Sequence, residues 1–201
     1  IEKAPMEKII VADCDGVLLN WEYAFCVWLE AKGYTQVPDG NKEYNLAKRF
    51  GISGNKAAEQ VKIFNASAAM GFLPALRDAR YYVKRLHEEL GYDFHCVTSL
   101  GLDPSAKKLR QMNLDKLFGP TAFPVLECLD TNAPKNAALE KYRDSGYYWI
   151  EDKFENAICG QNLGMNPILI EHGWNMNEDI PDGMKKVTTW KELYNYITGE
   201  Q

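Results

Sequence analysis

Short apolar runs alternate with amphipathic helical segments along most of the 201 residues. Each run is too short for a helix and is bounded by turn-forming residues, which favours buried strands. Strands that alternate with helices form a parallel sheet with helices on both faces, so we expect an α/β fold. The predicted strands cover residues 9–12, 94–97, 122–126, 147–150, 167–170 and 187–189, and the predicted helices 21–32, 44–50, 55–70, 76–90, 104–117, 133–143, 154–163 and 190–197.

The segment between the first two predicted strands is long. About 80 residues separate these strands, whereas a simple crossover helix needs far fewer. The surplus begins just past the first strand, on the side where that strand ends. We therefore expect a small helical cap over residues 20–75, inserted into a core of residues 1–19 and 76–201. Such a cap would cover the carboxyl end of the sheet as a lid.

Two acids follow the first apolar run. Asp13 and Asp15 stand directly after residues 9–12, and Gly16 lets the chain turn sharply behind them. Open α/β sheets bind their ligands beyond the carboxyl ends of the strands. Two carboxylates this close repel each other unless a cation or proton lies between them, and oxygen ligands suit Mg²⁺. A calcium loop would need further acids and a closing glutamate, whereas Val17 opens an apolar stretch.

Later strands also end in polar residues. Thr98 and Ser99 follow the second strand, Lys135 begins a helix, and Glu151 and Asp152 follow the strand at 147–150. Alone, each has an ordinary structural explanation as a helix cap, a loop hydroxyl or a solvated lysine. Neighbouring strands of a parallel sheet bring these ends together. The sequence therefore predicts acids, hydroxyls and an ammonium group around one crevice.

This set of residues resembles the motifs of the haloacid dehalogenase superfamily. The segment Asp-Cys-Asp-Gly-Val-Leu at positions 13–18 is similar to its first motif, and Thr98, Lys135 and the acidic pair at 151–152 correspond in order to the later ones. The match covers residues 8–19 and 90–170. It implies a Rossmann-like core. An acid at Asp15 is typical of members that hydrolyse or transfer phosphate. One departure is Asn156, where the family often carries another aspartate.

The resemblance also implies catalytic roles. Asp13 would be the nucleophile that forms an aspartyl phosphate. Asp15 would protonate the leaving alcohol and then accept a proton from the attacking water. Thr98, Ser99 and Lys135 would bind the phosphoryl oxygens, with Thr98 and Lys135 counted among the catalytic residues.

The same resemblance implies a Mg²⁺ site. The implied ligands are the Asp13 carboxylate, the backbone carbonyl of Asp15 and the Asp152 carboxylate. Glu151 would contact a metal-bound water or support the ligands from behind. The metal-site residues are therefore Asp13, Asp15, Glu151 and Asp152.

The predicted cap is rich in aromatic residues, which bears on the substrate. Most of them should form the core of the cap, and a few could stack on a ring. The chain resembles the 5′(3′)-deoxyribonucleotidases loosely, in the aromatic helix after the first motif and in the Phe-Leu-Pro step at 72–74. The expected function is Mg²⁺-dependent hydrolysis of a phosphate monoester, with nucleoside monophosphates as candidate substrates. The aromatic residues are Trp21, Tyr23, Phe25, Trp28, Tyr44, Phe50, Phe64 and Phe72.

Three alternatives stay open. The substrate could be a small sugar phosphate or organic-acid phosphate, and a phosphomutase or phosphotransferase would share every catalytic residue. A phospho-accepting receiver domain of a signalling pathway is a more distant alternative. It fits less well because Lys135 precedes the last acidic pair, whereas a receiver domain would place its lysine last.

Composition narrows the classes of partner and compartment. The net charge is −5 and no lysine- or arginine-rich stripe is present, which argues against a nucleic-acid polymer as partner. No apolar run has the length of a bilayer span, so we expect no membrane contact. Five scattered cysteines and the lack of a secretory leader favour reduced thiols in the cytoplasm. A small phosphorylated metabolite remains the expected partner, and the oligomeric state stays open.

Overall fold

The computed structural model describes residues 7–200, so residues 1–6 and 201 of the predicted core lie outside it. Six parallel strands form one sheet in the order β3-β2-β1-β4-β5-β6, which confirms the predicted α/β class. The central position of β1 matters because β2 and β4 pair with it on either side. The strands are β1 (Ile9–Ala12), β2 (Asp93–Thr98), β3 (Val125–Cys128), β4 (Tyr148–Glu151), β5 (Asn166–Ile170) and β6 (Lys185–Val187).

Both faces of the sheet are buried. In β1, Ile10 and Ala12 pack into one apolar cluster and Val11 into another, because successive side chains of a strand point to opposite faces. The first cluster includes residues of α4 (Ala79–Glu88), α5 (Pro104–Phe118) and α8 (Trp190–Thr198). The second includes residues of α6 (Asn136–Leu139), and α7 (Phe154–Asn162) packs on β4 and β5. Helices therefore cover both faces, as the alternating sequence pattern predicts.

Two predicted strands are shifted. The strand predicted at 122–126 begins only at Val125, because Pro124 before it has no N–H group for the sheet. The strand predicted at 187–189 ends at Val187. The two residues behind it serve α8 instead: the Thr189 hydroxyl caps the helix, and Thr188 hydrogen-bonds Glu192 through its backbone N–H and its hydroxyl.

Three predicted helices are too long. The helix predicted at 55–70 is α3 (Gly54–Asn65), followed by the 3₁₀ turn η2 (Ala68–Gly71). The helix predicted at 76–90 begins only at Ala79, because Arg77 has a left-handed backbone with φ of 40°. The helix predicted at 133–143 is reduced to α6 and the 3₁₀ turn η3 (Glu140–Tyr142).

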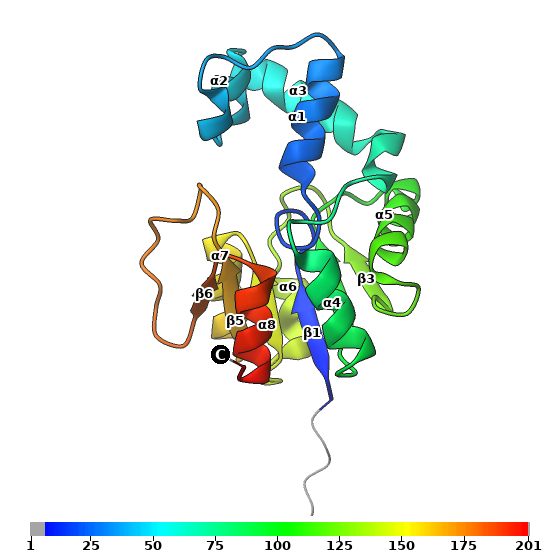
Figure 1. Ribbon diagram of the computed structural model, residues 1–201, viewed down its shortest axis with the longest axis vertical. Coiled ribbons are helices and arrows are strands. Elements are labelled where there is room, and N and C mark those ends of the chain that lie inside the picture. The colour runs from blue at the N-terminus through cyan, green and yellow to red at the C-terminus, as the bar shows by residue number, and fades with distance from the viewer. Residues whose placement is uncertain (1–6, 201) are drawn as a thin grey trace, which may run out of the picture.

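Residues 20–75, which we call the cap, carry three helices that lie beyond the carboxyl ends of the strands (Figure 1). They are α1 (Trp21–Ala31), α2 (Leu46–Phe50) and α3, with a 3₁₀ turn η1 (Gly40–Lys42) between α1 and α2. The Asn20 side chain caps α1 by accepting a hydrogen bond from the Tyr23 N–H. An aromatic cluster joins α1 to α3, with the Trp21 and Phe25 rings stacked 5.0 Å apart and Phe64 edge-on to both.

The cap is joined to the core by two linkers that lie side by side. Leu19 and Ala75 form an antiparallel bridge. The Asn20 N–H donates to the Pro74 carbonyl at 2.8 Å, and the Leu76 N–H donates to the Leu18 carbonyl at 2.8 Å. The chain thus leaves the core and returns to it through hydrogen-bonded neighbours.

The helices and thiols of residues 7–200 give two further facts. No helix in this range has the length and apolar character needed to cross a bilayer. All five cysteines are free; Cys14, Cys26 and Cys96 are buried, and Cys128 and Cys159 are partly exposed.

Candidate active site

Buried charge is concentrated at one place. Among residues 7–200, five charged side chains are buried, and all five gather where β1 ends. The alignment of Ala12 with Ile150 in the β1–β4 pair places the acids that follow these strands next to each other. Charges are costly to bury unless they are paired, so this cluster is the candidate functional site. The five are Asp13, Arg110, Lys135, Glu151 and Asp152.

Lys135 links two of the acids. Its Nζ donates to Asp13 Oδ1 at 2.7 Å and to Glu151 Oε2 at 2.9 Å. Lys135 immediately precedes α6, and its ammonium group lies 5.2 Å from the centre of the Trp149 ring. Burial alone would lower the pKa of Lys135, but the attraction of both carboxylates raises it above its usual value, so the group is charged. The sequence therefore placed Lys135 correctly beside Asp13.

Glu151 is fully engaged. While one oxygen accepts from Lys135, its Oε1 accepts from the backbone N–H groups of Asp152 at 3.0 Å and Lys153 at 3.2 Å. Burial opposes its ionisation, but the charge of Lys135 and side-chain hydrogen bonds to its neighbours lower the pKa of Glu151. Glu151 thus anchors Lys135 as a carboxylate.

The other two acids are crowded. Asp13, Glu151 and Asp152 each offer an oxygen within 4.8 Å of the others, and all three residues are buried. Burial, followed by repulsion from Glu151, raises the pKa of Asp13 to about 6. Burial and repulsion from Asp13 and Glu151 likewise raise the pKa of Asp152 well above its usual value. Three carboxylates against one ammonium group leave an excess of negative charge, which fits a hard divalent cation such as Mg²⁺.

The turn after Asp13 brings the chain close to Asp152. The carbonyl of Cys14 accepts from the N–H groups of Leu18 at 2.8 Å and Leu19 at 3.1 Å, which folds residues 14–19 into a compact turn. Gly16 has φ of 79°, and a Cβ atom there would lie 2.3 Å from Asp152 Oδ2. Only glycine tolerates both the left-handed backbone and this approach.

Asp15 is held by an arginine that sequence reasoning missed. Arg110 of α5, which is fully buried, donates from Nη1 to Asp15 Oδ1 at 2.7 Å and from Nη2 to Oδ2 at 3.1 Å. The Asp15 side chain is one-third exposed and also lines the cavity described below. It does not belong to the three-carboxylate cluster, so a metal contact through its backbone carbonyl stays a prediction. Arg110 Nε has no hydrogen-bond partner.

The two predicted hydroxyls differ in their surroundings. Thr98 is the last residue of β2, next to β1, and is buried at 2% exposure. The Ser99 hydroxyl donates to the Ala133 carbonyl at 3.3 Å and so supports the segment that precedes Lys135. Binding of phosphoryl oxygens by either hydroxyl stays a prediction.

The loop after β5 was also missed. His172 Nε2 lies 2.6 Å from the Gly16 carbonyl, and its ring stacks on Trp174 with centres 4.3 Å apart. Trp174 Nε1 and Asn175 Nδ2 both donate to the Asp152 carbonyl, at 3.2 and 2.7 Å. Burial, then the charge of Arg77, lowers the pKa of His172, so a neutral ring donates its Nε2–H to Gly16. The loop therefore fixes the backbone of both acidic segments.

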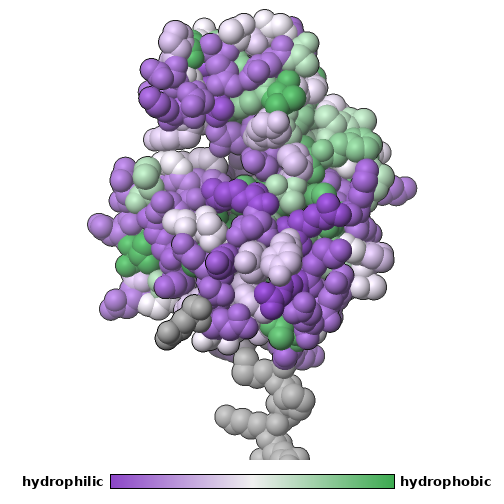
Figure 2. Space-filling view, in the orientation of Figure 1, coloured by the Kyte–Doolittle hydropathy of each residue, from purple (hydrophilic) through white to green (hydrophobic). Residues whose placement is uncertain are grey.

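A cavity of about 580 Å³ lies between the cap and these residues. In Figure 2 a notch separates the upper part of the molecule, which is the cap, from the core below. Of the cap aromatics, only Trp21 and Tyr44 line the cavity, while Phe25 and Phe64 are buried in the apolar core. The core side contributes Asp15, Gly16, Leu76, Arg77, Asp152, Lys153, Phe154, Glu155, His172, Trp174, Asn175 and Glu178.

Comparison with known sequences gives one distant relative. No protein-family model matches the chain. An uncharacterized 32.4 kDa protein from the Gp30-rIII intergenic region of Enterobacteria phage T4 is 25% identical over 201 residues. The aligned region is 96% of this chain and 70% of the phage protein.

Comparison with solved structures is more informative. A haloacid dehalogenase-like hydrolase of Streptococcus pneumoniae, SP0104, has a TM-score of 0.62 at 15% identity, covering 96% of this chain and 100% of that one. The HAD-hydrolase YfnB of Bacillus subtilis, bound to magnesium, has a TM-score of 0.61 at 14% identity, and the match covers 95% of this chain and 98% of YfnB. The D,D-heptose 1,7-bisphosphate phosphatase of B. bronchiseptica, complexed with magnesium and phosphate, has a TM-score of 0.60 at 12% identity, and the match covers 96% of this chain and 99% of that phosphatase. These likenesses show a shared fold.

Proposed function

We propose, for a chain that has the fold of the haloacid dehalogenase-like hydrolases, that it is a Mg²⁺-dependent phosphatase of a small phosphate monoester. The observation that carries the proposal is the cluster of Asp13, Lys135, Glu151 and Asp152, buried at the end of the central strand. The cavity next to it has the size of a small-molecule site. Structural neighbours that bind magnesium or phosphate support the same reaction class.

Asp13 is the proposed nucleophile. An oxygen of its carboxylate attacks phosphorus and forms an acyl phosphate, while the bond from phosphorus to the leaving oxygen breaks. Lys135, at 2.7 Å from Asp13 Oδ1, orients the carboxylate and offsets part of the repulsion between it and the anionic phosphate. Water then attacks phosphorus, which releases phosphate and restores Asp13.

Asp13 and Asp152 would hold Mg²⁺, with the Asp15 backbone carbonyl as a further ligand and Glu151 behind them. The bound cation would supply positive charge that draws the phosphate toward the carboxylate nucleophile. The crowding that raises the pKa values of Asp13 and Asp152 supports this assignment. The loop with Trp174 and Asn175 keeps Asp152 in place through its carbonyl.

Asp15 is the proposed acid and base. Its proton goes to the leaving oxygen in the first step, and it accepts a proton from water in the second. Both of its oxygens accept from Arg110 in this structure, so the first step requires Asp15 to turn toward the cavity. Asp15→Asn should reduce the hydrolysis of alkyl phosphates more than that of nitrophenyl phosphate, because a poor leaving group depends more on the acid.

Phosphate release provides the main test. Purified protein should release phosphate from nitrophenyl phosphate with Mg²⁺ and not with EDTA, and Asp152→Asn should require more Mg²⁺ for the same rate. Asp13→Asn should lower kcat by more than about a hundredfold, because it removes the nucleophile. Equal rates in Mg²⁺ and EDTA would contradict the metal role, and free phosphate as the product separates a hydrolase from a mutase.

Nucleoside monophosphates are the first candidates for the natural substrate. The Trp21 and Tyr44 side chains from the cap and Trp174 from the core line the cavity, and stacking of a base on one ring contributes about 1–3 kcal/mol. A phosphate-release screen over nucleotides, sugar phosphates and organic-acid phosphates tests this choice. Preference for a small aliphatic phosphate over all nucleotides would end the nucleotide proposal and leave the phosphatase proposal intact.

A further inference from the structure

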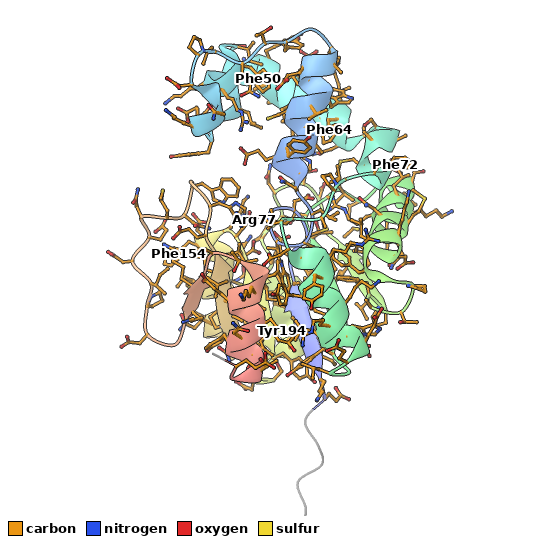
Figure 3. All side chains as sticks on the ribbon, in the orientation of Figure 1. Phe50, Phe64, Phe72, Arg77, Phe154 and Tyr194 are labelled. Carbon is orange, nitrogen blue, oxygen red and sulfur yellow. The ribbon has the colours of Figure 1, made fainter. Side chains whose placement is uncertain are left out.

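We propose that Arg77 determines specificity by binding a second anionic group, a carboxylate or a second phosphate, on the organic part of the substrate. This inference rests on the proposed phosphatase function and changes the order of its candidate substrates, because an organic-acid phosphate or a bisphosphate carries a second anion and a nucleoside monophosphate does not. Figure 3 shows Arg77 at the junction of the cap and the core. The residue follows the second linker directly and lines the same cavity as Asp15 and Asp152.

Two cations line the cavity, Arg77 and Lys153, and among residues 7–200 neither side chain has an ion pair or a hydrogen bond, whereas nearby cations outside the lining are paired. Arg49 pairs with Glu22 at 2.7 Å, Arg110 with Asp15 at 2.7 Å, and Lys135 with Asp13 at 2.7 Å. Within residues 7–200, no ion pair or side-chain hydrogen bond includes Arg77. An arginine in this state presents its full set of donors to a ligand, and a carboxylate or phosphate matches the fork of the guanidinium.

The backbone of Arg77 gives a second, independent observation. Its φ of 40° lies in the left-handed region, which is unfavourable for a long side chain. The neighbours on both sides are fixed: the Leu76 N–H donates to Leu18, and Asp78 accepts from the N–H groups of Trp190 and Lys191 at 3.0 Å each. Strained residues held this firmly cluster at ligand-binding positions. A glycine at position 77 would avoid this strain. The presence of an arginine instead therefore points to a role of its side chain.

The surrounding charges define how a substrate would lie. Arg77 and His172 line the same cavity, and His172 in turn contacts the Gly16 carbonyl beside the acidic cluster. A substrate with its phosphate at Asp13 and Lys135 would therefore direct its organic part along the cavity toward Arg77. Glu155 and Glu178 also line the cavity and would favour an amine instead, so the experiment includes a cationic probe.

Three probes of matched size test the proposal: 2-hydroxyethyl phosphate, carboxymethyl phosphate and 2-aminoethyl phosphate. We expect the wild-type chain to show a kcat/KM for carboxymethyl phosphate at least about tenfold above that for the other two. Arg77→Gln keeps the strained backbone and removes the charge, so the ratio of kcat/KM for carboxymethyl phosphate to that for 2-hydroxyethyl phosphate should fall to about one. Arg77→Lys should retain part of the preference. Arg80→Gln, an exposed arginine that lies outside the cavity, is the matched control and should keep the full preference.

Arg77→Gly separates the two observations. It should raise Tm by about 2–4 °C through relief of the strain, while losing the preference for the carboxylate. The proposal is overturned if the wild type uses all three probes equally, if it prefers the amine, or if Lys153→Gln rather than Arg77→Gln removes the preference. Release of phosphate from none of the probes, nor from nitrophenyl phosphate, would instead overturn the proposed function on which this inference rests.

Discussion

Asp13 is both the proposed nucleophile and a source of instability. It is buried beside Glu151 and Asp152, and its pKa of about 6 in the folded protein exceeds the ordinary value of 3.8. A raised pKa means that the native state binds a proton more tightly than the unfolded chain does. The stability of the metal-free protein is therefore greatest for this group below about pH 4 and is lost as the pH rises through 6.

Asp13→Asn should consequently stabilise the metal-free protein at pH 7 while removing activity. The gain in the free energy of unfolding is up to about 3 kcal/mol, and Lys135 keeps Glu151 as its partner. Denaturant unfolding in EDTA at pH 5 and pH 7 measures it, with a larger gain expected at pH 7. Addition of Mg²⁺ should then stabilise the wild type more than the variant. A variant that is less stable than the wild type at pH 7 would contradict this reading of the cluster.

Gly16→Ala should disrupt the proposed metal site. The new methyl group would lie 2.3 Å from Asp152 Oδ2, on a backbone with φ of 79°. We expect the variant to need more Mg²⁺ and to lose roughly a hundredfold in kcat/KM, which corresponds to about 3 kcal/mol. Gly33→Ala is the matched control, because Gly33 has φ of 97° and nothing within 4 Å of its Cβ position. It should lose stability by about 1–2 kcal/mol and keep its activity. Equal activity losses in the two variants would show that strain alone is responsible.

At the scale of elements, the sequence predicts best those parts that a local pattern defines. The strands β1, β2, β4 and β5 lie within one residue of their predicted positions because buried parallel strands appear as apolar runs. Lys135 was placed beside the acids through its order along the chain. The predictions for β3 and β6 were misplaced, because Pro124 delays the start of β3 and the threonines after Val187 cap α8. The helix predicted at 133–143 is broken because its second half forms a 3₁₀ turn.

Residues that act over a long sequence distance could not be found in this way. Arg110 is one of several cations in α5, and only the folded structure shows that it pairs with Asp15, 95 positions away. His172 and Asn175 lie in an irregular loop, where no periodicity marks a buried side chain. One signal could have identified these two residues: they follow the buried strand β5, just as the predicted site residues follow other strands.

The contact of α7 with β4 has no spare volume. A Cβ atom at Gly160 would lie 2.3 Å from Trp149 Cδ1, and Trp149 also lies under the ammonium group of Lys135. Gly160→Ala should lower the free energy of unfolding by about 1–3 kcal/mol through overpacking. Gly54→Ala, at the first residue of α3 with nothing within 4 Å, should stabilise by about 0.4–1 kcal/mol. Thermal unfolding of both variants measures these changes in stability. If Gly160→Ala leaves the stability unchanged, α7 can move away from the sheet.

At the scale of the whole molecule, the cap also touches the core outside the two linkers, where Tyr44 meets Gly173. A Cβ atom at Gly173 would lie 3.8 Å from the Cβ of Tyr44, which is near the mean separation in disulfides. If the cap must open for substrate to enter, the double variant Tyr44→Cys with Gly173→Cys should lose activity by roughly tenfold or more on oxidation and regain it on reduction.

The two single variants, oxidised and reduced in the same way, control for effects on the five native cysteines. Mass spectrometry of digested protein confirms that the intended bridge has formed. Full activity in the bridged protein would show that substrate reaches Asp13 without any movement of the cap.

Movement of the cap would also reach the proposed acid through α5. The side chain of Asn113 donates to the carbonyl of Leu73 and accepts from its N–H, both at 3.0 Å, next to the second linker. One turn earlier on the same helix, Arg110 holds Asp15. The helix thus connects the base of the cap to the residue that must turn toward the leaving group.

The paired linkers have a consequence for how such a protein changes over generations. Leu19 and Ala75 face each other where the chain leaves the core and returns, so these two points stay adjacent whatever lies between them. A genetic exchange of the intervening segment, even for one of very different length, would leave the strands and the acids behind them undisturbed. Selection can therefore replace the cap in a single event, while the strands and the acids at their ends are inherited together.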